Sequence, residues 1–304
     1  MPTYNRPKEL EDCIVSLLKQ TVKPSELIIV DDGKLESIPH LEELKSAGIE
    51  TIHAKKATPG LTESRNKGIS LAKGDIVLFF DDDVILHHEY LEEILKVYSS
   101  IPFEQIGGVG GMMINRPTKG PFAVVRKIIE IIFLLSWRKE GRILRSGFFT
   151  DLQEYEHPFQ ETVQVDYLPG CAMSYRKDIF SEFAFTEKYR DYGFGEDKDF
   201  SFQVSKKYKL FIQKSACLRH LESAEMRPDK KLYGKKYILG RYLFFKNRVQ
   251  TRAWEQILFF YAVTGYTIIR ILALAISPTK ENAQHLAGIF QAVKDICTRQ
   301  VPVI

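Results

Sequence analysis

Three adjacent aspartates, Asp81, Asp82 and Asp83, directly follow an uninterrupted apolar run from Ile76 to Phe80. Such a run is typical of a strand that is buried on both faces of a sheet. Three neighbouring carboxylates repel one another, so they need a counter-charge at the tip of a strand. Mg²⁺ or Mn²⁺ carrying a diphosphate is a suitable partner, because these cations prefer oxygen ligands and open α/β sheets bind ligands beyond the carboxyl ends of their strands. An aspartate-rich turn or helix cap explains the same residues equally well.

A second acidic pair, Glu196 and Asp197, follows Gly195 and begins a predicted helix that continues to about Lys207. A helix N-terminus would stabilise an ionised Asp197, whereas the neighbouring Glu196 carboxylate would oppose it. By itself the pair favours a helix cap with an acidic first turn. His220 ends a late strand, and its neutral imidazole could bind a metal, although a lone histidine is more often structural.

Short connections between alternating strands and helices indicate an α/β fold with a mainly parallel central sheet and right-handed crossovers. The apolar spacing predicts helices over 8–20, 41–47, 62–72 and 89–98, and strands over 27–30, 49–54, 76–80, 109–114, 163–168 and 210–221. Residues 122–137 are strongly apolar and predict an amphipathic helix that lies on the core or on a membrane. Residues 138–161 show no period and predict loops over the site.

The composition is that of an ordinary globular protein: 304 residues, 44% hydrophobic and 27% charged. Four cysteines lack CxxC spacing, which predicts a reducing compartment and argues against a zinc site or a disulfide framework. The net charge of +4 is unevenly distributed, because Lys206 to Arg252 alone carry +11. An acidic front and a basic rear suggest a metal-using half and a half that meets anions such as phospholipid, diphosphate or nucleic acid.

Five short motifs occur in one order along the chain. They are Pro2-Thr3-Tyr4-Asn5-Arg6, Val30-Asp31-Asp32-Gly33, Gly60 to Gly68 (GLTESRNKG), Phe80-Asp81-Asp82-Asp83 and Gly195-Glu196-Asp197. In this order and at these separations the chain resembles family 2 glycosyltransferases with the GT-A fold, over about Met1 to Glu222. Members of the family usually have an apolar strand just before the first motif. Because Met1 stands where that strand should end, we expect the recorded start to be internal or the chain to be a fragment.

The resemblance implies a nucleotide-sugar site built from residues near the carboxyl ends of the strands. The residues it assigns to the donor are Pro2, Thr3, Tyr4, Arg6, Asp31, Arg65, Asn66, Asp81 and Asp82. Asp31 would accept an N–H of the base, and Arg65 would reach a phosphate or hold the aspartates. The alternatives are a plain connecting loop for Tyr4 and Arg6, turn chemistry at Asp32, and a surface ion pair for Arg65.

The resemblance also implies a divalent cation, Mg²⁺ or Mn²⁺, and a catalytic pair. Asp81 and Asp83 would bind the cation with His220 as a further ligand, and Asp82 could substitute if the register shifts by one residue. Asp197 would act as the general base, with Glu196 beside it. The residues implied on the acceptor side are Gly170, Cys171, Tyr192 and Phe194; the two aromatic rings could equally be ordinary core residues.

The rear of the chain predicts a second region, 223–304, that is basic and then apolar, after a catalytic domain over 1–222. Ile257 to Ile276 is long enough to span a bilayer. Arg270 within it makes a span costly, by about 3 kcal/mol on insertion scales. A basic run followed by an apolar helix fits a helix that lies in the interface of an anionic membrane. The alternative is a helix packed on the catalytic domain.

Together these features predict a metal-dependent, inverting glycosyltransferase that moves a sugar from a UDP-, dTDP- or GDP-sugar to a hydroxyl of a saccharide or lipid-linked acceptor. The expected setting is cell-surface polysaccharide or glycolipid synthesis, peripheral on the cytoplasmic face of the membrane, and nucleic acid is not an expected partner. A nucleotidyltransferase lacks its Gly-rich phosphate loop here, and Gly107 to Gly111 do not fit the dinucleotide motif GxGxxG. The rival hypothesis is a non-catalytic protein that binds nucleotide sugars or polyanions.

Overall fold

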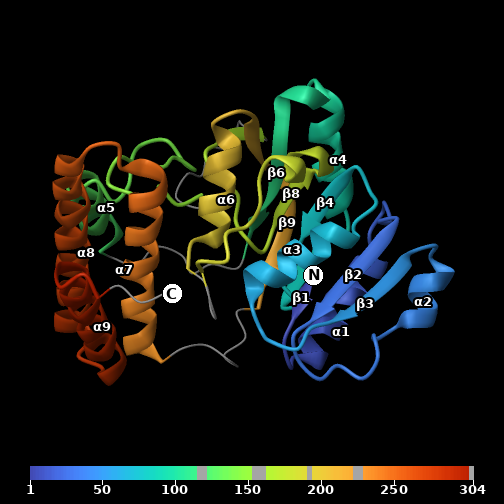
Figure 1. Ribbon diagram of the computed structural model, residues 1–304, viewed down its shortest axis with the longest axis horizontal. Coiled ribbons are helices and arrows are strands. Elements are labelled where there is room, and N and C mark those ends of the chain that lie inside the picture. Colours follow the sequence, from blue (N-terminus) through green and yellow to red (C-terminus); the bar gives the residue numbers. More distant parts are fainter. Residues whose placement is uncertain (115–121, 153–161, 190–193, 222–228, 301–304) are drawn as a thin grey trace. The chain divides into compact units, whose positions relative to one another are not determined.

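The computed structural model describes residues 1–114, 122–152, 162–189, 194–221 and 229–300, and these residues form two compact units (Figure 1). The first unit is α/β and comprises Met1–Arg116, Glu156–Glu187 and Glu196–Ser223. The second comprises Pro117–Tyr155, Lys188–Gly195 and Ala224–Ile304. Two segments that precede the predicted boundary at residue 222 belong to the second unit, together with the residues from Ala224 onward.

A parallel three-stranded sheet, in the order β1-β2-β3, opens the first unit. Its strands are β1 (Pro2–Thr3), β2 (Glu26–Asp31) and β3 (Glu50–Lys55), and its helices are α1 (Pro7–Leu18), α2 (Leu41–Ser46) and α3 (Leu61–Leu71). Proline at the first position of α1 suits a helix start, because its missing N–H would have no partner there. Leu10, Cys13, Ile14 and Leu17 form the buried stripe of α1, as their spacing predicts.

A second, mixed sheet follows in the order β4-β8-β6-β9-β5, with β7 paired to β9. Within it β6 and β9 are parallel, whereas β4–β8, β6–β8, β5–β9 and β7–β9 are antiparallel. The α/β class is confirmed, and the expected parallel pairing holds for the first sheet and for β6–β9. The strands are β4 (Ile76–Phe79), β5 (Val84–Leu86), β6 (Ile106–Met113), β7 (Thr162–Val165), β8 (Met173–Arg176) and β9 (Lys209–His220), and the helices of this part are α4 (Tyr90–Ser100) and α6 (Glu196–Ser205).

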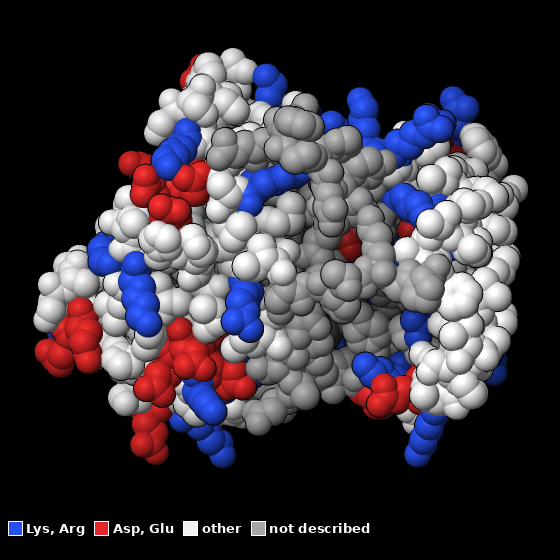
Figure 2. All heavy atoms as spheres, turned by 180° about the vertical axis from the view of Figure 1, so that it is seen from behind, with Lys and Arg blue, Asp and Glu red and all other residues white. Residues whose placement is uncertain are grey.

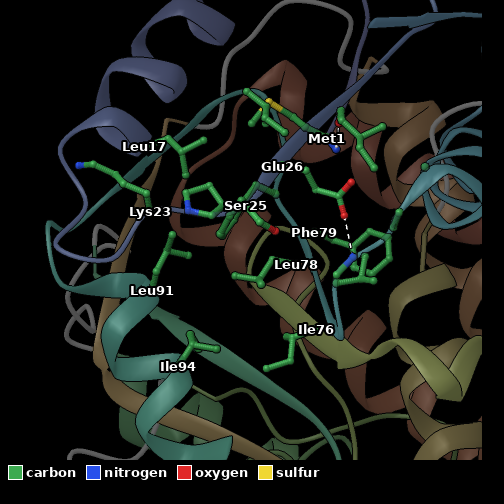
Figure 3. A pocket seen from close by; sticks show the side chains of 18 of the residues that line it. Met1, Leu17, Lys23, Ser25, Glu26, Ile76, Leu78, Phe79, Leu91 and Ile94 are labelled. Carbon is green, nitrogen blue, oxygen red and sulfur yellow. Dashed lines mark hydrogen bonds between the residues drawn. The ribbon is translucent and has the colours of Figure 1, made fainter. Parts of the chain in front are cut away.

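An apolar cavity of about 410 Å³ lies between β2 and β4 (Figure 3). In the described part of the chain, no strand pairing joins β2 to β4. Ile76, Val77 and Leu78 are consequently only half-buried, so the prediction that this strand is buried on both faces is wrong for three of its residues. The N-terminal ammonium of Met1 donates to the carbonyl of Ile28 at 2.9 Å, at one end of the cavity.

The second unit is helical, with its own core. Its helices are α5 (Ala123–Ile132), α7 (Lys230–Phe244), α8 (Gln256–Ile276) and α9 (Lys280–Cys297). Shorter turns of helix lie at Phe103–Gln105 and Lys177–Ser181 in the first unit, and at Phe245–Val249 and Ala253–Glu255 in the second. Helices α7 and α9 pack with their backbones close together, because a Cβ on Gly288 would lie 2.0 Å from the Lys231 carbonyl oxygen. Leu135 and Phe148 share the core of this unit with Ile238, Phe245 and Phe259.

Among the described helices, one is long and apolar enough to cross a membrane: Ala253–Ile276, with a mean hydropathy of 1.9 over its best window. Length and composition alone give this result, and 22% of that window is buried in the protein. Phe259, Ala262 and Val263 contribute the buried side. Arg270 donates to Asn282 Oδ1 on α9 at 3.0 Å, so the charge in this helix is bonded within the unit.

Candidate active site

Asp81, Asp83 and His220 bring ligand atoms within 4.8 Å of one another, as a metal site requires. Asp81 and Asp83 follow β4, and His220 ends β9, whose antiparallel partner β5 begins at Val84 opposite His220. His220 Nε2 lies 3.0 Å from an Asp83 oxygen and 3.9 Å from an Asp81 oxygen. The aspartates are thus brought to the imidazole by the β5–β9 pairing, which no local sequence pattern reveals.

The pKa of His220 shows that the aspartates of this cluster favour a positive charge beside them. Burial would lower the pKa of His220, but Asp83, Cys171 and Asp81 raise it to about 11. The imidazolium is therefore the counter-charge of the aspartates when no other cation is bound. Two carboxylates and an imidazole are also a donor set that Mn²⁺ or Mg²⁺ accepts, so the residues present fit the predicted cation.

Asp82 points to a different set of partners. Its side chain is fully buried, accepts from Thr3 Oγ1 at 2.8 Å, and pairs with Arg6 Nη2 at 2.8 Å. Burial raises the pKa of Asp82 to about 6, although Arg6 and Thr3 act against this rise. Arg6 also contacts Asp83 at 3.1 Å. These bonds tie Asp82 to the loop after β1, whereas the candidate metal cluster consists of Asp81, Asp83 and His220.

Arg65 links the aspartates to the second acidic pair. It is only 2% exposed, and its guanidinium lies 2.9 Å from Glu196 Oε1 and 3.6 Å from Asp81 Oδ1. Its Nη2 also lies 3.4 Å from the Gly170 carbonyl oxygen, and its guanidinium carbon lies 5.5 Å from the centre of the Phe185 ring. The alternative of a surface ion pair is therefore wrong. The neighbouring Asn66 exchanges two hydrogen bonds with the Phe185 backbone, so its amide holds this segment in place.

Glu196 and Asp197 occupy the first turn of α6 and are both buried, but their environments differ. Asp197 accepts from the Gly170 N–H at 2.9 Å, from the Lys198 N–H at 2.8 Å and from Lys198 Nζ at 2.6 Å. Burial opposes its charge, yet Lys198 and Arg65 hold the pKa of Asp197 below its usual range. For Glu196, burial and the charge of Asp197 raise the pKa despite the Arg65 contact. Asp197 is the carboxylate that stays ionised.

The loops after β1 and β2 border a cavity of about 660 Å³, lined among others by Thr3, Arg6 and Asp31. The Asp31 carboxylate accepts the backbone N–H groups of Gly33 at 2.7 Å and Leu35 at 3.0 Å. It thus shapes the turn and lines the cavity at once. Pro2 and Tyr4 are half-buried in the same loop region, but they are not among the residues that line this cavity.

The predicted acceptor residues that the structure describes are divided between the two units. Gly170 belongs to the site, because a Cβ there would come within 3.0 Å of Arg65 and 3.2 Å of Asp197. Cys171 is buried beside His220 and has its pKa raised by burial. Phe194 belongs to the second unit, where its ring centre lies 4.9 Å from that of Tyr233. Tyr192 lies outside the described residues.

Sequence reasoning missed two residues that position the site. Asp32 accepts from the Gly60 N–H at 2.9 Å and from Ser64 Oγ at 2.7 Å, so it anchors the start of α3 and thereby sets Arg65. Its position in an Asp-Asp-Gly turn suggested only local chemistry. Lys198 pairs with Asp197, and its place directly after the acidic pair was the signal available in the sequence.

Comparison with known proteins agrees with the family resemblance of the sequence motifs. The family described as Glycosyl transferase family 2 matches residues 1–183. The glucosyl-dolichyl phosphate glucuronosyltransferase of Haloferax volcanii is 29% identical over 59% of this chain and 52% of its own length. The chain spans about half or less of the curated relatives that it matches first.

Solved structures resemble the whole chain at low sequence identity. The mannosyltransferase PcManGT of Pyrobaculum calidifontis, in complex with GDP-Man and Mn²⁺, gives a TM-score of 0.58 at 11% identity, over 97% of this chain and 86% of that one. S. aureus TarS 1-349 in complex with UDP-GlcNAc gives 0.53 at 16% identity, over 99% and 80%. At these identities the likeness shows the fold.

Proposed function

The chain belongs to glycosyl transferase family 2, and we propose that it transfers a sugar from a nucleotide-diphosphate sugar to a hydroxyl acceptor, with inversion and with a divalent cation. One observation carries the proposal. Arg65 contacts both Asp81, in the cluster fit for a cation, and Glu196, next to the ionised Asp197. A single buried guanidinium thereby couples a diphosphate-binding site to a proton acceptor.

In the proposed reaction an acceptor oxygen forms a bond to the anomeric carbon while the bond from that carbon to the diphosphate oxygen breaks. Asp197 takes the acceptor's proton, which its lowered pKa permits at neutral pH. Arg65 holds the second acidic pair and the aspartate tract at a fixed separation. Asp81, Asp83 and His220 would hold the cation, which when bound stabilises charge on the leaving diphosphate.

The identity of the donor is open among UDP, GDP and dTDP sugars. Fold neighbours in complex with GDP-Man or UDP-GlcNAc support the UDP and GDP sugars. The cavity of about 660 Å³ beside Asp31 is where the nucleoside would bind. The acceptor hydroxyl belongs to a saccharide or to a lipid-linked saccharide, and the name of the Haloferax volcanii relative, a glucosyl-dolichyl phosphate glucuronosyltransferase, supports the lipid-linked form.

The test is a thermal-shift series with UDP, GDP and dTDP, each with Mn²⁺, with Mg²⁺ and with EDTA. A ligand bound only to the folded protein raises its melting temperature. We expect one diphosphate to stabilise the protein only with metal, and Asp83→Asn to abolish this shift. Asp178→Asn is the matched control, since Asp178 pairs with Arg176 outside the site.

Turnover is then measured as release of the nucleoside diphosphate with a panel of sugar acceptors, and the anomeric configuration of the product is read by NMR. Inverted product with metal-dependent release supports the proposal. Metal-independent release with retained configuration would reject both the metal and the single displacement. Donor binding without turnover in any acceptor panel would favour the non-catalytic binding protein.

A further inference from the structure

Exposed apolar side chains gather on two helices of the second unit. On α5, Val124, Val125, Ile128 and Ile132 are 50–71% exposed. On α8, the exposed apolar residues are Ile257, Tyr261, Ile271, Leu272 and Ile276. Both sets follow helical spacing, so each helix presents one apolar stripe outward. We call the two stripes together the α5–α8 face.

The two stripes belong to one surface, because the helices adjoin. The ring of Phe133, directly after α5, stacks on Tyr261 of α8 with centres 4.8 Å apart. Gly265 permits this approach, since a Cβ there would lie 2.2 Å from the Phe133 Cβ. Figure 2 shows the helical unit, on the right, as a broad area without charged side chains, with Lys and Arg and a group of Asp or Glu at its edges. Exposed apolar side chains that gather on one surface are typical of an interaction site.

The only two tryptophans of the chain flank this face. Trp254 precedes α8 and is 52% exposed, and Trp137 follows α5 and is 46% exposed. Tryptophan is normally well buried in globular proteins. Half-exposed tryptophans at the ends of apolar helices are instead typical of a membrane–water interface, where the indole has both an apolar and a polar neighbour.

The exposed charges beside the two tryptophans are positive. Arg138 and Lys139 follow Trp137, Arg252 precedes Trp254, and all three are exposed. Helix α8 contains no Asp or Glu, and the one carboxylate of α5, Glu130, is buried and pairs with Arg126. A positive edge attracts anionic lipid, whereas two copies of the same face would repel each other.

The contacts on the opposite side of α8 indicate how this helix would lie relative to a membrane. Phe259, Ala262 and Val263 are buried in the core of the helical unit, and Arg270 is bonded to Asn282 on α9. The side of α8 that packs against other helices and holds the bonded Arg270 is not available to lipid. Such a helix can lie along the surface with its outer stripe immersed.

We propose that α5 and α8 together form a docking surface for an anionic lipid bilayer, lying in the plane of the headgroups with Trp137 and Trp254 at the interface. None of the residues that define the α5–α8 face is among those assigned to glycosyl transfer. If the acceptor is lipid-linked, this docking would bring the enzyme to it. A second copy of the chain is the competing occupant, which the experiment distinguishes.

The test uses the full chain and vesicles of phosphatidylcholine with or without an equal part of phosphatidylglycerol. We expect co-sedimentation with the anionic vesicles only, a blue shift of the tryptophan emission on binding, and weaker binding in high salt because exposed charges are then screened. Equal binding to neutral vesicles, or none to either, would overturn the proposal.

Val124→Glu and Ile257→Glu place a charge on the most exposed large apolar residue of each helix, 71% and 69% respectively, so folding should be unaffected. Each is expected to reduce vesicle binding at least about tenfold, since a charge in the interface costs on the order of 1 kcal/mol or more. Leu232→Glu is the matched control, on α7 in the same unit and 41% exposed.

Two outcomes would count against the bilayer. One is binding by both charged variants as strong as that of the unaltered chain. The other is a dimer in size-exclusion chromatography that Val124→Glu dissociates, which would assign the face to a second copy. Turnover with a water-soluble acceptor should be the same in all three variants, so failure of the docking surface is separable from failure of the proposed reaction.

Discussion

At the scale of single residues, two adjacent carboxylates are given opposite properties by their neighbours. Asp197 is held ionised by Lys198 and Arg65, whereas burial beside Asp197 raises the pKa of Glu196. In many active sites, two neighbouring acidic groups have different pKa values, and this difference decides which group acts as the acid and which as the base. In the proposed reaction Asp197 is therefore the proton acceptor, and Glu196 is the carboxylate that contacts Arg65.

Asp197→Asn should therefore remove turnover and leave donor binding largely intact. We expect kcat to fall by about 10²–10⁴, the usual contribution of a general base, while the KM for the donor changes little. Release of nucleoside diphosphate measures both. Asp199→Asn is the matched control, because Asp199 is buried in the same helix but bonds Gln203. Full turnover in Asp197→Asn would show that another group accepts the proton.

At the scale of elements, the sheet of the first unit is divided where β2 and β4 face each other across a cavity. Leu27 and Ile28 line one side, and Ile76 and Leu78 line the other, as Figure 3 shows for the β4 residues. The Met1 ammonium lies at the same place, and burial lowers its pKa to about 6. An apolar space between two strand edges is the shape that an extended segment fills.

Adding about five alternating Val and Ile residues ahead of Met1 should stabilise the protein. The added segment would bury apolar surface in the cavity, bond the edges of β2 and β4 and replace the buried terminal amine by a peptide bond. We expect the melting temperature to rise by roughly 5 °C, since 1 kcal/mol changes it by about 2–8 °C. A Gly/Ser segment of equal length also replaces the terminal amine but does not fill the cavity, so an equal rise with that control would contradict the prediction.

The helical unit depends on a neutral histidine where three helices meet. His285 of α9 lies 3.2 Å from the Tyr266 hydroxyl of α8, and its ring centre lies 5.5 Å from that of Tyr233 on α7. Burial, together with Arg270 and Lys230, lowers the pKa of His285 to about 4. Protonation is therefore easier in the unfolded chain, where the pKa is about 6.5.

The resulting stability is present above pH 6.5 and is lost as the pH falls from 6.5 toward 4. We expect the loss to be about 1–3 kcal/mol, after a discount for partial solvent screening. His285→Gln should show a smaller loss over this window, measured by urea unfolding at several pH values. His88→Gln, at a largely exposed histidine, should follow the unaltered protein. Identical curves for His285→Gln and the unaltered chain would reject this role.

At the scale of the whole molecule, sequence reasoning succeeded where the signal is local. The apolar runs and helical stripes predicted β2, β3, α1 and α3 to within a few residues, and the motifs predicted the fold and family. It failed where the answer depends on contacts distant in sequence. The bonds from Asp82 to Thr3 and from Asp32 to Ser64 join residues 79 and 32 positions apart. No periodicity within either segment indicates such a partner.

The division into units also depends on contacts between residues distant in sequence, and it has a consequence for the whole chain. Residues 122–137 were predicted to be a helix on the core or on a membrane, but not part of the C-terminal region. In the structure, Leu135 and Phe148 are buried with Ile238, Phe245 and Phe259. The second unit is therefore assembled from three segments, two of which lie within the predicted catalytic range 1–222.

A chain ending at residue 222 should consequently be insoluble or aggregated, because it keeps 117–155 and removes the helices that bury Leu135 and Phe148. Replacing 117–155 and 188–195 by short Gly/Ser linkers in that same shortened chain should restore a soluble monomer, since the remaining residues are those of the first unit. Soluble yield and size-exclusion chromatography of the two chains measure the effect. A monodisperse, cooperatively unfolding chain of residues 1–222 would show that the apolar side chains of 117–155 can be buried without the C-terminal helices. The fold of the first unit would then not depend on the second.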